Sequence, residues 1–220
     1  MVKTPSKTLV QLGLDQVCEY IYVTKPNWTE LSDVLGGNEG YPFIPQEIWD
    51  GCVWNYYGVD MREWSIQTVS HFYRNCDYAH FIQAAIVGES GAEVDRDDFR
   101  VGRYKLDDAQ ESFKGVTLNE LFFKTGLPDV LVMDIEGCEL EVFLSYDWFH
   151  KPEFIVVETH TFDACNAILE LMLFSGYSLY TITGQTTLWD CNPVFSFLRS
   201  DFVSDRIRDF YVYNPKKVQS

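Results

Sequence analysis

Short apolar runs recur along most of the chain and are separated by more polar segments. The runs that lack polar alternation are Thr8–Leu12, Cys52–Val59, Phe81–Val87, Val130–Met133 and Phe154–Val157. Uninterrupted apolar runs bounded by Gly or Pro are typical of strands buried on both faces, as in a parallel sheet covered by helices. The pattern therefore predicts a mostly parallel sheet.

Helices are predicted between several of these strands. In the segment Arg62–Tyr73 the side chains expected to be buried are Trp64, Val69, Phe72 and Tyr73. In the segment Asp163–Phe174 the apolar face holds Ala167, Ile168, Leu171 and Phe174. This amphipathic spacing predicts a helix that covers the sheet and ends at Gly176.

The sequence also predicts a helix after Thr117 and two strands that close the sheet. Thr117 and Glu120 have the spacing of a capping box, which predicts a helix that stops at Gly126. Two closing strands, Ser178–Thr183 and Val194–Leu198, are joined by a short loop and predict an antiparallel hairpin at the sheet edge. Between Gly88 and Lys114 the periodicity is weak, and irregular structure or a hairpin is expected there.

The whole pattern predicts one α/β domain over residues 1–220 with a Rossmann-like architecture. A segment of about residues 17–49, rich in Gly, Pro and aromatic residues, is predicted to be an insertion before the second strand. Its aromatic side chains have two open interpretations, which are stacking on a sugar or purine ring and plain packing.

Acidic and histidine residues follow two of the predicted strands. Asp134 comes directly after Val130–Met133, and Glu158 and His160 follow Phe154–Val157. Ligands of parallel sheets bind at the carboxyl ends of the strands, so these three residues are candidate functional residues. The alternative for Asp134 is a cap of the next helix, predicted over Glu136–Leu144.

A second candidate site lies at the ends of the first two strands. Gly13 ends the first strand and would let the backbone approach a ligand closely. Asp60 ends the second strand, where an acid commonly accepts hydrogen bonds from ribose hydroxyls, although it would also serve as the N-cap of the following helix. The single glycine in Gln11–Asp15 leaves little room for a pyrophosphate, which favours an adenosine ligand without phosphates.

Composition narrows the classes of ligand. The net charge of −16 opposes binding to nucleic-acid phosphates and to anionic membranes, so a small ligand that is neutral or carries its own positive centre is expected. A hydrophobic fraction of 46% supports a sizeable core. The six cysteines contain no C-x-x-C pair, and no apolar run reaches the length of a membrane span or of a signal-peptide core. These features predict a cytoplasmic protein with free thiols.

Motifs in the central part of the chain resemble those of the FkbM-type methyltransferases. The matching residues are Thr117–Leu121 (TLNEL), Asp134–Glu139 (DIEGCE), Val157–Glu158 and Gln83–Gly88 (QAAIVG). The resemblance covers roughly Ala79 to Tyr180. The chain departs from the family pattern in its first motif, which is reduced to QLGLD at 11–15, and at Asp60, which Met61 rather than Pro follows.

The resemblance implies a class I methyltransferase fold with a seven-stranded, mostly parallel sheet and an antiparallel C-terminal edge hairpin. It also implies S-adenosylmethionine as the cofactor and methylation of hydroxyls, often on sugars. Carried over position by position, the implied cofactor contacts are Gln11, Gly13, Asp15, Asp60, Met61, Ala84, Ala85 and Asp134. Glu136 and Glu139 are interpreted as part of a charged helix face.

A methyl transfer to a sugar hydroxyl needs help in removing the hydroxyl proton. Asp134, Glu158 and His160 would provide it either as ligands of Mg²⁺ or Mn²⁺ or as a metal-free site in which His160 is the base. The preferred function is a sugar or glycan O-methyltransferase. The alternatives are a methyltransferase for a phenol, lipid or peptide, and a non-catalytic binding module that kept the fold. The sequence leaves the acceptor and the oligomeric state open.

Overall fold

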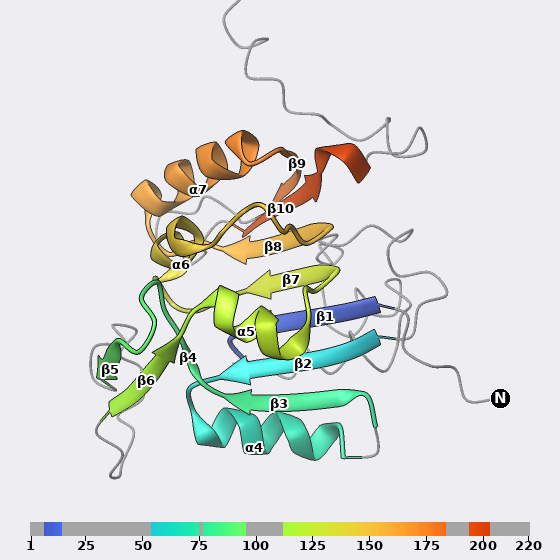
Figure 1. The fold of residues 1–220 in the computed structure, drawn as a ribbon, viewed down its shortest axis with the longest axis vertical. Helices are drawn as coiled ribbons and strands as arrows, with labels where there is room; N and C mark the ends of the chain where they lie inside the picture. Colours follow the sequence, from blue (N-terminus) through green and yellow to red (C-terminus); the bar gives the residue numbers. More distant parts are fainter. Residues whose placement is uncertain (1–6, 15–53, 75–76, 96–111, 184–193, 203–220) are drawn as a thin grey trace, which may run out of the picture.

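The computed structural model describes residues 7–14, 54–74, 77–95, 112–183 and 194–202, and its core is a seven-stranded sheet (Figure 1). The strands are β1 (Lys7–Leu12), β2 (Trp54–Asp60), β3 (Ala79–Gln83), β7 (Val130–Met133), β8 (Phe154–Glu158), β9 (Tyr177–Thr183) and β10 (Val194–Arg199). Their spatial order is β3-β2-β1-β7-β8-β10-β9. The first five are parallel, whereas β10 runs antiparallel to both β8 and β9. The predicted sheet and its antiparallel closing hairpin are therefore confirmed.

Helices connect the parallel strands and cover the sheet. They are α4 (Glu63–Phe72), α5 (Leu118–Thr125), α6 (Glu139–Ser145) and α7 (Phe162–Phe174), and a 3-10 turn, η2 (Ser200–Phe202), follows β10. Figure 1 shows α5 crossing in front of the sheet, with α6 and α7 beside β8. None of the helices in the described ranges is both long and apolar enough to cross a membrane.

The core lies between these helices and alternate residues of the central strands. Side chains of β1, β7 and β8 that point to one face pack with α5, α6 and α7 in a single buried cluster, which includes Leu12, Met133, Val157, Leu121, Phe143 and Ile168. Residues of the opposite face, such as Leu9, Val130 and Phe154, are fully buried as well. Burial of both faces explains why the strands are uninterrupted apolar runs.

A second, small sheet interrupts the predicted third strand. Its strands are β4 (Ala85–Ile86), β5 (Glu93–Asp95) and β6 (Ser112–Val116), in the order β4-β6-β5. The run Phe81–Val87 was predicted as one strand, but it divides at Ala84, whose backbone N–H donates to the Asp60 carbonyl at 3.0 Å. The antiparallel pairing of β5 with β6 confirms a hairpin at this position, although residues 96–111 lie outside the described part.

Two of the predicted buried aromatic residues are exposed. Trp64 is 41% exposed because it lies in the first turn of α4, where the Arg62 guanidinium sits 5.2 Å from its ring centroid. Phe174 is 93% exposed and is the last residue of α7. Val69, Tyr73 and Ile168 are buried as predicted.

The capping box at the start of α5 is present as predicted. The Thr117 hydroxyl accepts from the Glu120 backbone N–H at 3.3 Å, and the Glu120 carboxylate accepts from the Thr117 N–H at 2.9 Å. Replacing Thr117 by Ala should lower the free energy of unfolding by about 1 kcal/mol. Urea titration checks this, with Thr68→Ala at an exposed position of α4 as a control. Equal midpoints for the two variants would contradict the prediction.

Candidate active site

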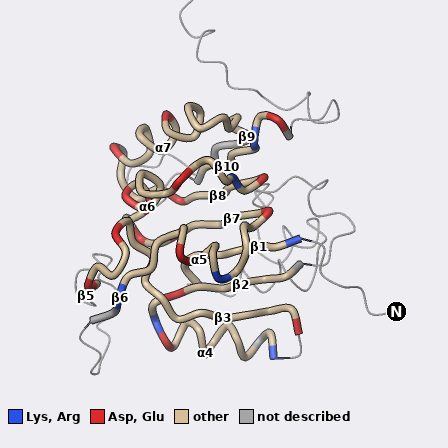
Figure 2. Tube along the Cα trace, viewed as in Figure 1, with Lys and Arg blue, Asp and Glu red and all other residues tan. Residues whose placement is uncertain are grey.

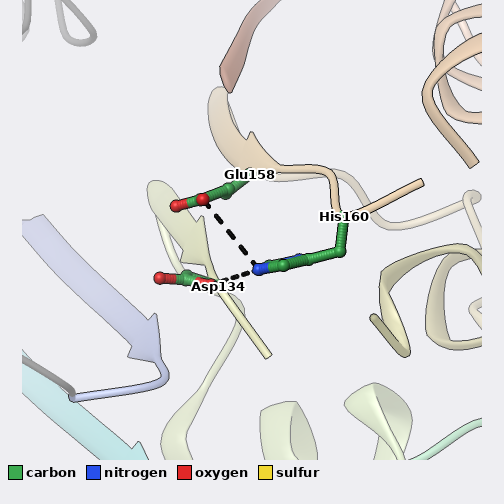
Figure 3. A group of neighbouring side chains, drawn as sticks. All are labelled: Asp134, Glu158 and His160. Carbon is green, nitrogen blue, oxygen red and sulfur yellow. Dashed lines mark ion pairs between the residues drawn. The ribbon is translucent and has the colours of Figure 1, made fainter. Parts of the chain in front are cut away.

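Three predicted site residues meet where β7 and β8 end. Asp134 directly follows β7, Glu158 is the last residue of β8, and His160 lies two positions further on (Figure 3). His160 Nε2 is 3.6 Å from Asp134 Oδ1 and 3.9 Å from Glu158 Oε1. One potential ligand atom from each of the three residues lies within 4.8 Å of the others. The structure thus brings together the three residues for which the sequence predicted a metal or base function.

The segment between Asp134 and α6 is a turn and not the predicted helix. Glu136 has a φ of 61° and Gly137 a φ of 111°, values that a right-handed helix excludes. Helix α6 begins only at Glu139, and its N-cap position is occupied by Cys138. The interpretation of Asp134 as the cap of this helix is therefore wrong. Its Oδ1 atom is buried and has no hydrogen-bond partner among the described residues.

Glu136 and Glu139 belong to the cluster, which corrects their interpretation as a charged helix face. Glu139 Oε1 lies 2.9 Å from His160 Nδ1, and Glu136 Oε2 lies 3.2 Å from His160 Nε2. The Glu139 side chain is fully buried. Sequence reasoning missed both residues because it treated the segment as a regular helix. The signal that would have found them is Gly137, since a glycine between two acids favours a turn.

His160 is the centre of an acidic environment. Burial lowers the pKa of His160, but hydrogen bonds to Glu136 and Glu139 and the charges of Glu139 and Asp134 outweigh it and raise the pKa to about 10. The imidazole is therefore protonated at neutral pH, with one ring N–H directed to each glutamate. In this state His160 cannot accept a proton from an acceptor hydroxyl.

The same cluster perturbs two of its carboxyl groups in opposite directions. Burial and the neighbouring Glu158 charge raise the pKa of Asp134 to about 8. The hydrogen bond from His160, followed by the charges of His160 and Arg62, lowers the pKa of Glu136 despite its partial burial. A pair of acids with diverging pKa values beside a cationic histidine is a common property of catalytic sites.

These shifts predict that the metal-free protein loses stability as pH rises. The stabilising contribution of His160 is complete below its usual pKa of 6.5 and is lost as pH rises through about 10. The unfolding midpoint should therefore fall between pH 7 and 10, and His160→Gln should flatten this slope. Thermal unfolding across the pH range measures it, with His150→Gln at an exposed position as the control. A parallel slope in His160→Gln and wild type would contradict the prediction.

The predicted cofactor residues lie along the same edge, at the ends of β1, β2 and β3. Gln11 is buried, and its amide accepts from the Tyr56 hydroxyl at 3.1 Å and donates to the Gly13 carbonyl at 3.3 Å. Gly13 has a φ of 86°, and a Cβ atom there would lie 1.7 Å from the Asp134 carbonyl oxygen. Gly13 thus allows close approach of two backbone segments of the protein itself. Asp15 lies outside the described residues, as does the segment 17–49.

The acid at the end of β2 is held by groups of the protein. Asp60 Oδ2 accepts from the Leu14 N–H at 2.8 Å, and Oδ1 accepts from the Arg62 N–H at 2.7 Å. The Arg62 guanidinium donates to both oxygens. The N-cap of α4 is Arg62, so Asp60 does not occupy that position. The nearby residues Met61, Ala84 and Ala85 are buried, and their function as cofactor contacts stays a prediction.

Charge is distributed unevenly around this edge. Figure 2 shows acidic positions gathered where β7 and β8 end, with the basic start of α4 nearby. The Arg62 charge, at the start of α4, also lowers the pKa of Glu136 in the turn after β7. The edge as a whole therefore favours a ligand with a positive centre beside the acidic cluster.

The strand order and the antiparallel closing hairpin define the class I fold of S-adenosylmethionine-dependent methyltransferases. The model of the methyltransferase FkbM domain matches residues 65–179, just over half of the chain. The chain therefore belongs to the FkbM methyltransferase family, and it is a methyltransferase of the S-adenosylmethionine-dependent type. The resemblance in the central motifs is confirmed. No curated protein matches the chain.

Three solved structures of methyltransferases show a low similarity to the chain. Precorrin-6y C5,15-methyltransferase from Geobacter metallireducens is 10% identical, with 89% of this chain and 82% of that chain covered and a TM-score of 0.42. Magnesium protoporphyrin IX methyltransferase from Synechocystis, solved with bound SAM, is 10% identical, with 89% and 71% covered and a TM-score of 0.41. TrmK of M. capricolum, in complex with S-adenosyl-homocysteine, is 11% identical, with 92% and 68% covered and a TM-score of 0.42. Similarity at this level says nothing about the acceptor of the present chain.

Proposed function

We propose that this protein is an O-methyltransferase that transfers the methyl group of S-adenosylmethionine to a hydroxyl of a sugar or glycan. The observation that carries the proposal is the convergence of Asp134, Glu158 and His160 at the carboxyl ends of two adjacent strands, in a chain of the FkbM family. Carboxylate oxygens readily accept hydrogen bonds from sugar hydroxyls. The net charge of −16 further favours an uncharged acceptor over a polyanionic one.

The cluster fits a hard divalent cation such as Mg²⁺ or Mn²⁺. Two carboxylates and one imidazole are the donor types that suit these ions, and their ligand atoms already lie within 4.8 Å of one another. Asp134 Oδ1 is buried without a hydrogen-bond partner in the described part of the chain, so it is available as a ligand. A divalent ion held by these residues would lower the pKa of the acceptor hydroxyl. Binding of such an ion to His160 would displace the Nε2 proton that now faces Glu136.

Without a metal, Asp134 is a better candidate base than His160. The pKa of His160, raised to about 10, keeps the imidazole protonated, whereas the pKa of Asp134 is raised only to about 8. A carboxylate with a raised pKa is a stronger base than an ordinary one, and its Oδ1 accepts no hydrogen bond from the described residues, so it can accept a proton. His160 then stabilises the negative charge of the cluster.

Two measurements test the proposed function in sequence. Calorimetry should detect binding of S-adenosylmethionine, and absence of binding at millimolar cofactor would favour the non-catalytic module. Transfer of labelled methyl groups is then measured with sugars, glycans, phenols and peptides, and the expected product is a methyl ether of a sugar. A panel in which only phenols or peptides are methylated would exclude the sugar acceptor.

Metal removal distinguishes activation of the hydroxyl by a divalent ion from metal-free catalysis with Asp134 as the base. The EDTA-treated protein should lose methyl transfer and regain it with Mg²⁺ or Mn²⁺, because the activated hydroxyl depends on the ion. Ca²⁺, which takes longer bonds and more ligands, serves as the comparison ion. Activity that persists unchanged in EDTA would exclude the metal and leave Asp134 as the base.

A further inference from the structure

Glu139 is a buried carboxylate with three donors on one oxygen. Its Oε1 atom accepts from the Ile135 N–H at 3.2 Å and from the Gly137 N–H at 3.0 Å. The same atom lies 2.9 Å from Nδ1 of His160. The side chain is fully buried, and Oε2 has no hydrogen-bond partner among the described residues.

Burial of this carboxylate is costly for folding alone. Taking a charged group out of water is unfavourable unless hydrogen bonds compensate for it, and here only one of the two oxygens is bonded. An apolar side chain at the first position of α6 would fill the same space without this cost. The three contacts on Oε1 therefore indicate a positioning function.

The contacts of Glu139 connect the turn after β7 with the segment after β8. The two backbone N–H groups fix the turn after β7, including Glu136 in its left-handed conformation at a φ of 61°. The contact to Nδ1 fixes the ring of His160, which belongs to the segment after β8. One carboxylate thus sets both the position of Glu136 and the direction of His160 Nε2.

We propose that Glu139 is the positioning residue that orients His160, so that Nε2 faces Asp134, Glu136 and Glu158. The proposal rests on the proposed function in so far as Nε2 is the atom offered to a divalent ion. A carboxylate that accepts from the second ring N–H is the usual partner of a metal-binding histidine, and loss of such a partner lowers metal affinity by about 10- to 100-fold. In the metal-free protein the same contact keeps Nε2 directed at Glu136.

The variant Glu139→Gln tests the proposal with little risk to the fold. The amide oxygen can still accept from the two N–H groups of the turn and from Nδ1–H, so this variant removes only the negative charge. A second variant, Glu139→Leu, removes the acceptor atom itself. Glu141→Gln is the matched control, because Glu141 lies exposed in the same turn of α6 and outside the cluster. The three variants are compared with wild type by Mn²⁺ binding in electron paramagnetic resonance and by ¹H–¹⁵N spectra of the His160 ring. The His160 signal is assigned by its loss in His160→Gln.

The expected results distinguish a positioning function of Glu139 from a function in stabilising the fold alone. Glu139→Gln should bind Mn²⁺ about 10- to 100-fold more weakly, while Glu141→Gln binds it as wild type does. A lower melting temperature with unchanged Mn²⁺ affinity and an unchanged ring spectrum would overturn the proposal. If wild type binds no Mn²⁺, the proposed metal site is wrong. The ring spectrum then still tests whether Glu139 orients His160. A solvent-protected Nδ1 proton in wild type that is lost in Glu139→Leu supports it, and its persistence in Glu139→Leu overturns it.

Discussion

Replacing Asp134 by Asn should lower kcat/KM for methyl transfer about a thousand-fold, the usual range for loss of a proton-transfer group. The carboxylate charge is required in both chemical alternatives, since Asp134 either holds the divalent ion or accepts the proton of the acceptor hydroxyl. Asn has nearly the same shape, and the Asp134 Oδ1 atom accepts no hydrogen bond within the described chain, so the contact that is lost is its ion pair with His160 Nε2 at 3.6 Å. The loss should therefore appear in catalysis and not in folding.

The melting temperature of Asp134→Asn gives an independent check, because it should stay the same or rise although the activity falls. Burial and the Glu158 charge raise the pKa of Asp134 from about 3.8 to about 8, so its ionisation opposes folding increasingly as pH rises through that range. Asn cannot ionise, and the variant should melt at the same or a higher temperature than wild type at pH 8 to 9. Asp163→Asn, an exposed acid at the start of α7, is the activity control. Activity of Asp134→Asn within tenfold of wild type would show that Asp134 does not act on the acceptor.

The edge of the sheet where the site lies could be predicted from the sequence. Parallel strands place their carboxyl ends on one side, so polar side chains that follow two neighbouring strands are expected to lie close together. Asp134 and His160 met this condition, and the structure places them 3.6 Å apart. The capping box at Thr117 was predictable for a similar reason, because both of its contacts are local in sequence.

The turn inside the site could not be derived from periodicity. The segment from Glu136 to Leu144 has a helix-compatible composition, yet its first residues adopt positive φ angles. In this turn the Glu139 carboxylate accepts from the N–H groups of Ile135 and Gly137 and contacts the His160 ring. The last of these contacts joins residues 21 positions apart, and such a tertiary contact leaves no local pattern.

The structure shows a reason for the glycine at position 13 that the sequence did not predict. Its flexibility had been interpreted as room for a ligand, but the neighbour that requires it is the backbone of Asp134. The Asp134 N–H donates to the Leu12 carbonyl at 2.9 Å, and the Gly13 N–H donates to the Val59 carbonyl at 2.9 Å. The end of β1 is therefore tied to β2 on one side and to the start of the acidic turn on the other. Gly13 supports the site through the position of Asp134.

Substitution of Gly13 by Ala should consequently destabilise the protein and disturb the site together. An added Cβ would lie 1.7 Å from the Asp134 carbonyl oxygen, so the backbone of one of the two segments must move. The positive φ of 86° adds a penalty of about 1–2 kcal/mol for any L-residue with a side chain. We expect a total loss of at least about 3 kcal/mol. At roughly 2–4 °C per kcal/mol this corresponds to a fall in melting temperature of about 10 °C.

Gly91→Ala separates the two causes of this loss. Gly91 has a similar φ of 72°, but no atom lies within 4 Å of the Cβ that would be added. This control should therefore show only the conformational penalty of about 1–2 kcal/mol and should keep its methyl-transfer activity. Gly13→Ala should lose most of its activity even at temperatures where it is fully folded, because displacement of the Asp134 backbone moves the carboxylate away from His160. Equal melting temperatures for the two variants would show that the close approach of Gly13 to Asp134 does not stabilise the fold.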